Sequence, residues 1–310
     1  MKIYKWFSIN DEKKKEINKL RPIFIAGSRD ISIERIKKLT QNFLKSGNVL
    51  WGCLEDEYIN GLENSPQFKT LPLSKLEKCL EEVKSEKVNI LRYFERDIKY
   101  ILRELDFTAV IYINGSWYKS FHYNPHYSEL ISRKTPFKLI SPFDSETEAK
   151  EYAKNIKSDI KIDLTKKYSE KELMNICKTV AKQSFDHTFQ TGALLVKNEK
   201  IIITSFNSIP PFETYAMHYG ALREKQFSPP NDANYYDTNH AEIEMIVKAG
   251  NEGIALEGCS LYVNLMPCPT CARAIAKTEI EEVVYELDHS DGYAVKLLES
   301  SGKKIKRVVP

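Results

Sequence analysis

Residues 260–285 read SLYVNLMPCPTCARAIAKTEIEEVVY. Apolar runs and a helical spacing predict a strand, a helix and a second strand over Ser260–Asn264, Cys268–Lys277 and Glu282–Tyr285. Cys268 and Cys271 are three residues apart at the start of the predicted helix, so both sulfurs face the same side. The segment therefore predicts an α/β unit in which two thiol groups lie close together at a helix N-terminus.

The same alternation extends to both sides of this segment. The predicted order of the second half of the chain is α-β-β-α-β-α-β-α-β, and its other elements are Ser169–Phe185, Gly192–Val196, Lys200–Phe206, His240–Ala249, Asp291–Ser300 and Lys304–Val308. The helix between the last two strands indicates that these strands run parallel. A long connection over residues 207–239 separates the first two strands from the next helix. The second half is thus expected to be an α/β domain with five strands.

The first half of the chain also alternates between strands and helices. Strands are expected at residues 23–26, 49–51, 107–113 and 137–140, and helices at Ile31–Leu44, Leu73–Val83, Arg92–Leu105, Tyr127–Ser132 and Ser145–Ile156. Such alternation favours a Rossmann-like parallel sheet covered on both faces. A charged stretch at residues 157–167 without clear periodicity places the boundary near residue 160, which gives domains 1–160 and 161–310.

Composition narrows the class of protein. The chain has 310 residues and a net charge of only +3, which disfavours a nucleic-acid partner because such domains usually carry a strongly basic face. We find no signal peptide and no run of the ~20 apolar residues that would span a bilayer. We therefore expect a cytoplasmic protein with no membrane partner. In a reducing compartment, closely spaced cysteines indicate metal or redox chemistry rather than a disulfide.

The sequence HAE at residues 240–242 complements the two cysteines. His240, Cys268 and Cys271 offer one imidazole and two thiolates, which leaves a fourth position open for water, as is typical of catalytic Zn²⁺ sites. Glu242 lies close enough to move protons for that water. A histidine and glutamate at this spacing followed by proline and two cysteines is the signature of zinc deaminases. The alternative is a structural Cys2His zinc site with a fourth ligand elsewhere.

These motifs resemble the deoxycytidylate deaminases of the cytidine deaminase superfamily, through GALLVKNEKIIITSFNS at 192–208, HAEIEMI at 240–246 and residues 260–285. The resemblance implies a three-layer αβα fold with a mixed five-stranded sheet. It also implies Zn²⁺ held by His240, Cys268 and Cys271, and Glu242 as the catalytic proton shuttle. It further implies substrate contacts from Asn207, Ala241 and Pro267, with a turn residue as the less favoured interpretation of Asn207. Glu244 departs from the family pattern, which usually has asparagine there.

The connection over residues 207–239 is rich in aromatic and basic side chains. Its aromatic residues could stack on a base, and Arg223 could meet a substrate phosphate. The alternative is a surface loop or an oligomer contact.

The N-terminal half more faintly resembles the nucleoside 2-deoxyribosyltransferase-like Rossmannoid family, through FIAGSRD at 24–30 and AVIYINGSW at 109–117. The resemblance implies a nucleotide pocket lined by Gly27, Ser28, Asp97, Gly115, Ser116 and Glu129. The alternative is a non-catalytic domain that binds a nucleotide or mediates oligomerisation.

Three hypotheses follow for function. The first is hydrolytic deamination of a small-molecule nucleotide, dCMP to dUMP with release of ammonia, by an enzyme that forms homo-oligomers. The second is a deaminase of a polynucleotide or a modified nucleotide. The third is a nucleotide sensor, in which the N-terminal domain binds a nucleotide effector and regulates the deaminase.

Overall fold

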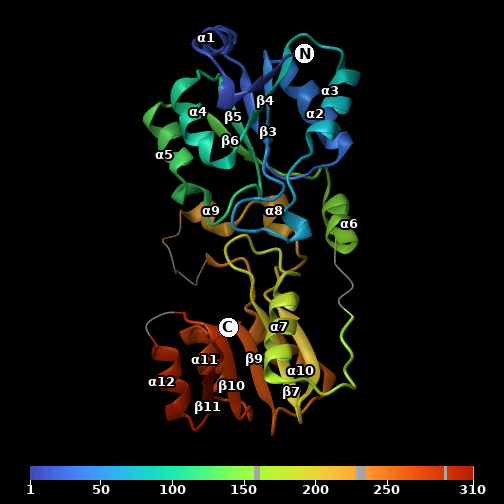
Figure 1. Ribbon diagram of the computed structural model, residues 1–310, viewed down its shortest axis with the longest axis vertical. Helices are drawn as coiled ribbons and strands as arrows, with labels where there is room; N and C mark the ends of the chain where they lie inside the picture. Colours follow the sequence, from blue (N-terminus) through green and yellow to red (C-terminus); the bar gives the residue numbers. More distant parts are fainter. Residues whose placement is uncertain (157–160, 228, 230–234, 290–291, 310) are drawn as a thin grey trace. The chain divides into compact units, whose positions relative to one another are not determined.

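The computed structural model describes residues 1–156, 161–227, 229, 235–289 and 292–309 (Figure 1). Contacts divide the chain into two compact units. The N-terminal unit contains residues 1–156 together with 214–236, and the C-terminal unit contains 157–213 together with 237–310. A segment of the long connection therefore belongs to the N-terminal unit, an arrangement that a single boundary near residue 160 does not anticipate. Among the described residues, no helix is long and apolar enough to cross a membrane.

The N-terminal unit is built on a six-stranded, fully parallel sheet with the strand order β1-β4-β3-β2-β5-β6. The strands are β1 (Ile3–Lys5), β2 (Ile23–Ala26), β3 (Val49–Leu54), β4 (Val88–Tyr93), β5 (Ala109–Ile113) and β6 (Phe137–Ile140). The chain runs from β2 to β3 on one side and later returns to β5 on the other side of β2. The carboxyl ends of β2 and β5 therefore form a topological switch point, where ligands of such sheets bind.

Helices cover both faces of this sheet, as its fully apolar central strands require. One core contains side chains of α1 (Asp11–Leu20), α4 (Ile98–Glu104) and α5 (Pro125–Ser132), and the other contains side chains of α2 (Ile33–Leu44) and α3 (Leu73–Val83). The last helix before the linker is α6 (Glu146–Ile156). The predicted Rossmann-like parallel sheet is thus confirmed.

Parts of the expected element list were wrong. The helix expected over Arg92–Leu105 is only Ile98–Glu104, because residues 88–93 pair with β3 as β4. Strand β1 and helix α1 were not predicted at all. Both are too polar to show a clear apolar period, since only the middle residue of β1 and only Ile17 of α1 are buried.

Two short helices form within the long connection, α8 (Tyr215–Tyr219) and α9 (Leu222–Gln226). Thr214 donates a hydrogen bond to the Ala149 carbonyl at 2.7 Å, which fixes the start of α8 beside α6. Glu224 of α9 accepts a hydrogen bond from the Phe121 backbone N–H. These contacts explain why the segment packs with the N-terminal unit.

The C-terminal unit contains a mixed five-stranded sheet with the order β11-β10-β9-β7-β8. The strands are β7 (Gly192–Lys197), β8 (Lys200–Phe206), β9 (Ser260–Leu265), β10 (Glu282–Leu287) and β11 (Lys304–Arg307). β7 is antiparallel to both β8 and β9, whereas β9, β10 and β11 are mutually parallel. The expected parallel arrangement of the last two strands is therefore confirmed.

Helix α7 (Glu170–Ala181) contributes to the core on one face of this sheet. The other core contains side chains of α10 (Ala241–Glu252), α11 (Pro269–Ile275) and α12 (Tyr293–Ser300). Asp291, the expected first residue of the last helix, lies outside the described residues. The unit is the predicted three-layer αβα domain (Figure 1).

Gly192 allows α7 to lie close against β7. A Cβ atom at this position would be 2.3 Å from the Cys177 carbonyl oxygen and 2.7 Å from the Ala181 nitrogen, both backbone atoms of α7. Neither atom can move without shifting the helix, so the glycine sets the spacing between the two layers.

We expect Gly192→Ala to lower the free energy of unfolding by about 1–3 kcal/mol, the usual cost of overpacking a core. Urea unfolding of the full chain would measure the change. Gly250→Ala is the matched control, because nothing lies within 4 Å of its added Cβ in α10 and alanine favours helix. Equal stability of the two variants would contradict this role of Gly192.

Candidate metal centre

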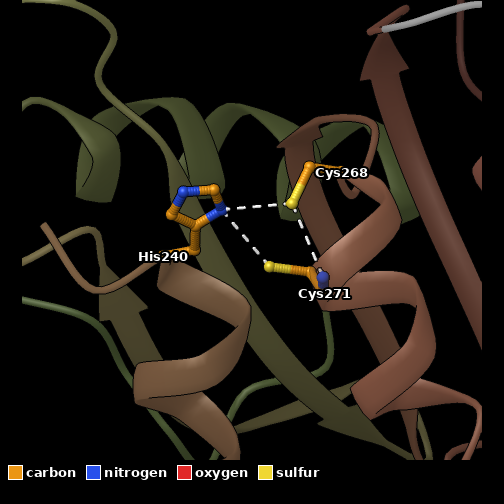
Figure 2. Close-up of side chains that lie close together, drawn as sticks. All are labelled: His240, Cys268 and Cys271. Atoms are coloured by element: carbon orange, nitrogen blue, oxygen red, sulfur yellow. Dashed lines mark hydrogen bonds between the residues drawn. The ribbon is translucent and has the colours of Figure 1, made fainter. Parts of the chain in front are cut away.

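Two helix N-termini bring three metal-binding side chains together in the C-terminal unit (Figure 2). His240 is the N-cap residue of α10, and Cys268 is the N-cap residue of α11. Cys271 follows in the first turn of α11, and its backbone N–H donates to the Cys268 sulfur at 3.5 Å. Pro269 occupies the first turn, where a missing N–H costs nothing. The local sequence PCPTC therefore starts a helix with both sulfurs at its N-terminus.

The three side chains form a compact cluster. His240 Nδ1 lies 3.5 Å from Cys268 Sγ and 3.3 Å from Cys271 Sγ. All three potential ligand atoms lie within 4.8 Å of one another, and Cys271 is buried. An imidazole and two thiols at these separations match the protein ligands of a catalytic zinc site. Sequence analysis predicted these three residues, and the structure brings them together.

The environment of the cluster favours a thiolate, the form of cysteine that binds metals. The hydrogen bond from the Cys271 thiol lowers the pKa of Cys268 to about 3, with further lowering by His240. A separate hydrogen bond between His240 and Cys268 raises the pKa of His240, so the imidazole and the sulfur stabilise each other's charge. The imidazole and the two sulfurs are therefore suited to bind a divalent cation.

Glu242 is buried in the first turn of α10, with only 3% of its surface exposed. Burial is the main cause that raises the pKa of its carboxyl above the ordinary range, and interactions with His240 and Cys271 partly oppose this shift. A raised carboxyl pKa beside the ligands is the kind of shift that favours general acid–base chemistry.

Asn207 comes directly after β8, and its side chain makes hydrogen bonds with three other residues of the C-terminal unit. Its Oδ1 accepts from the Thr191 N–H at 2.8 Å, and its Nδ2 donates to Asp186 Oδ2 and the Phe189 carbonyl. Asp186 Oδ2 also accepts from the Thr238 hydroxyl at 2.9 Å, two residues before His240. Through Asp186, Asn207 thus helps to position the chain segment just before His240. Its contact with a substrate stays a prediction.

Sequence reasoning missed Asp186 and Thr238, which have no recognisable motif. Only the three-dimensional fold reveals that Asp186 joins the end of β8 to the residues before α10. The other two residues expected to contact the substrate, Ala241 and Pro267, are buried. Ala241 is fully buried with its carbonyl accepting from Ser205 Oγ at 2.8 Å, and Pro267 is buried immediately before Cys268.

Glu244 lies in the first turn of α10, two residues after Glu242. Its Oε1 accepts hydrogen bonds from Ser208 Oγ at 2.5 Å and from Asn239 Nδ2 at 3.0 Å. Ser208 and Asn239 also pair through their backbones. The carboxylate therefore fastens the two ends of the long connection to each other beside the cluster.

The structure places Arg223 in the N-terminal unit rather than with the metal cluster. The residue is buried in α9, and its guanidinium carbon lies 3.9 Å from the centre of the Tyr236 ring. Its expected role with a substrate phosphate stays a prediction.

Four of the expected N-terminal pocket residues come together, and two lie elsewhere. Gly27 and Ser28 follow β2, and Gly115 and Ser116 follow β5, at the switch point of the parallel sheet. The other two make local contacts: Asp97 Oδ2 accepts from the Phe94 N–H at 3.2 Å, and Glu129 forms an ion pair with Arg103.

Comparisons with known proteins match the C-terminal part of the chain. Residues 167–287 match the family described as the cytidine and deoxycytidylate deaminase zinc-binding region. A deoxycytidylate deaminase of enterobacteria phage T4 is 29% identical over 144 residues, covering 36% of this chain and 75% of that protein. A probable deoxycytidylate deaminase of Drosophila melanogaster is 30% identical over 142 residues, covering 42% and 67%.

A dCMP deaminase of cyanophage S-TIM5, crystallised with dCMP and dUMP, is 21% identical and aligns with a TM-score of 0.37 over 45% of this chain and 96% of its own. The residues that match the family include all three of the clustered ligands and Glu242. Through its C-terminal region, the chain belongs to the family of cytidine and deoxycytidylate deaminases.

Proposed function

We propose that the protein is a zinc-dependent hydrolytic deaminase that converts dCMP to dUMP and ammonia. The observation that carries this proposal is the cluster of His240, Cys268 and Cys271 with the buried Glu242 carboxyl beside it. Membership of the deaminase family and the names of the matched relatives support a cytosine nucleotide as the substrate.

The donor atoms fit Zn²⁺ better than a harder cation. His240, Cys268 and Cys271 would hold the ion, and two sulfurs with one imidazole nitrogen are ligands that magnesium and calcium avoid. When bound, Zn²⁺ supplies a Lewis acid that makes water a nucleophile near neutral pH. Three protein ligands, rather than four, fit a catalytic site better than a structural one.

Glu242 would carry the protons of the reaction. Water adds to C4 of the cytosine ring, and the carboxylate takes up a proton and delivers it to ring nitrogen N3. The C4–N4 bond then breaks, and a second proton passes through the same carboxyl to the departing amine, which leaves as ammonia. Burial that raises the pKa of Glu242 suits this role, because the group must both accept and release a proton.

Purified full-length protein loaded with zinc would test the proposal directly. We would compare turnover of cytidine, dCMP, dCTP and single-stranded DNA by the change in ultraviolet absorbance as cytosine becomes uracil. Turnover of dCMP is the expected result. Activity on the oligonucleotide alone would replace the proposal with a polynucleotide deaminase, and nucleotide binding without turnover would favour a sensor. In the same assay we expect Glu242→Ala to lower kcat at least 100-fold while zinc content is unchanged, since general acid–base groups contribute about 10²–10⁴-fold.

Glu252→Ala is the matched control for that variant, because Glu252 is an exposed carboxylate at the other end of the same helix. Its kcat should stay within twofold of the unmodified protein. Substantial activity in Glu242→Ala would remove Glu242 from the proton transfers.

Metal content provides a second test, independent of the substrate. We expect Cys268→Ser to lose most bound zinc, because a hydroxyl is a poor replacement for a thiolate ligand. Elemental analysis after dialysis would measure the metal-to-protein ratio. Cys79→Ala, which removes a buried thiol from the N-terminal unit, should keep one equivalent. A full equivalent in Cys268→Ser would indicate a different ligand set.

Glu244 offers a test of the substrate's charge. Its carboxylate lies on the same helix as Glu242, so its negative charge would disfavour a phosphate-bearing substrate. Glu244→Gln can keep the hydrogen bonds to Ser208 and Asn239 while removing the charge. We expect a KM for dCMP about 2–5-fold lower with kcat unchanged, as for a partly screened charge. Deoxycytidine serves as the uncharged comparison substrate, and an equal change in its KM would contradict an electrostatic effect.

A further inference from the structure

Arg29 is a completely buried cation in the N-terminal unit, with 0% of its surface exposed. Its Nη2 donates to the Gln67 carbonyl at 2.7 Å and to the Tyr152 hydroxyl at 3.2 Å, and its Nη1 donates to the Gly115 carbonyl at 3.2 Å. None of these acceptors carries a formal charge. Within the described ranges, no carboxylate pairs with Arg29, and its Nε has no hydrogen-bond partner. A buried charge without a counter-ion is costly, so this site is suited to an anion.

The remaining partner of Arg29 is a weak one. Its Nη1 lies 2.9 Å from the sulfur of Met217, which comes from α8 of the long connection. A thioether is a poor acceptor and cannot neutralise a guanidinium. Gly115 makes room for this arrangement, because a Cβ atom there would lie 2.5 Å from Nη1 and 3.1 Å from Met217 Cγ. The methionine therefore occupies a position that an anionic oxygen would fill more favourably.

The location of Arg29 agrees with ligand binding. The residue follows β2 at the switch point between β2 and β5, where open parallel sheets bind ligands. The Arg29 backbone N–H donates to Ser116 Oγ at 3.3 Å, and the Ser28 hydroxyl is also buried there. A guanidinium with two nearby hydroxyls is typical of sites that bind a phosphoryl group.

A second observation comes from aromatic side chains near the same sheet edge. The Tyr112 hydroxyl, Trp117 Nε1 and His126 Nε2 are buried and have no hydrogen-bond partner among the described residues. The Tyr112 ring centre lies 6.1 Å from that of Trp117 and 5.4 Å from that of His126, so the three groups form one cluster. Each unpartnered buried group is unfavourable, which points to a ligand that carries complementary polar atoms.

Trp117 connects this cluster to the residues around Arg29, because it directly follows Ser116, whose hydroxyl accepts from the Arg29 N–H. The buried Tyr93 hydroxyl also has no hydrogen-bond partner among the described residues. Burial lowers the pKa of His126 to about 4, so its ring is neutral near pH 7 and can accept or donate a hydrogen bond. Aromatic rings with free polar atoms suit a planar heterocyclic base, and the guanidinium suits a phosphate.

We propose that the carboxyl edge of the six-stranded sheet is a second binding site, which takes the phosphoryl group of a nucleotide on Arg29 in place of the Met217 sulfur. The site belongs to the N-terminal unit and does not depend on the proposed deaminase activity. Met217 lies in α8, within the long connection between β8 and α10. Asn114 holds the same methionine, donating to its carbonyl at 3.0 Å.

Binding to the full-length protein would test this site. Isothermal titration calorimetry with inorganic phosphate, AMP and dTMP would distinguish free phosphate from a nucleotide as the ligand. We expect a nucleotide to bind with one site per chain outside the metal centre, and Arg29→Gln to weaken that binding about 10–100-fold, the loss typical of a charge-assisted contact. Arg96→Gln removes an exposed arginine from the same unit and should bind normally.

For Met217→Ala we expect the opposite change in nucleotide affinity. This variant remains informative if Arg29→Gln does not fold. Removing the sulfur that occupies Arg29 should tighten binding by about 3–10-fold, an effect that a purely structural arginine would not produce. No binding of the three probes, or Met217→Ala that binds no more tightly than the unmodified protein, would overturn the proposal. Binding that persists unchanged in Arg29→Gln would belong to the metal centre instead.

Discussion

The convergence of two helix N-termini on one point is the constraint on which the proposed chemistry depends. α10 and α11 each begin at a metal-binding residue, and these residues are His240 and Cys268. Free backbone N–H groups and the helix dipole favour negative charge at such a point, which helps to hold sulfur as thiolate. The carboxyl end of β9 leads into α11, and Ser205 of β8 donates a hydrogen bond to the Ala241 carbonyl in α10, so the sheet helps to fix where both helices begin.

A network outside the cluster holds this geometry in place. Asp186 connects Asn207 to Thr238, and Glu244 connects Ser208 to Asn239. Both links join the end of β8 to the residues just before His240. Because they are made by carboxylates, each is a charge-assisted contact and stronger than a hydrogen bond between neutral groups. The position of the imidazole is therefore set by the ends of the long connection as well as by α10 itself.

The sequence predicted most of the metal centre because its residues fall into two short motifs, and each motif starts a helix. It also predicted the parallel final strands, since a helix between two strands leaves little alternative. It could not predict the contacts of Asn207 with Asp186, which depend on a tertiary approach. In the N-terminal unit the turns after β2 and β5 were recognised by their glycines, whereas Arg29 was not singled out. Its burial, and the contact with Met217, follow only from long-range packing.

The path of the chain has a consequence for how the two units could change during evolution. The chain passes from one unit to the other after Ile156, after Glu213 and after Tyr236. A domain that occupies one continuous stretch can be exchanged through gene fusion at a single breakpoint, but neither unit here forms such a stretch. Replacing the N-terminal sheet would leave α8 and α9 without the surface they cover. Inheritance of the two units as a pair is therefore favoured over their separate shuffling among genes.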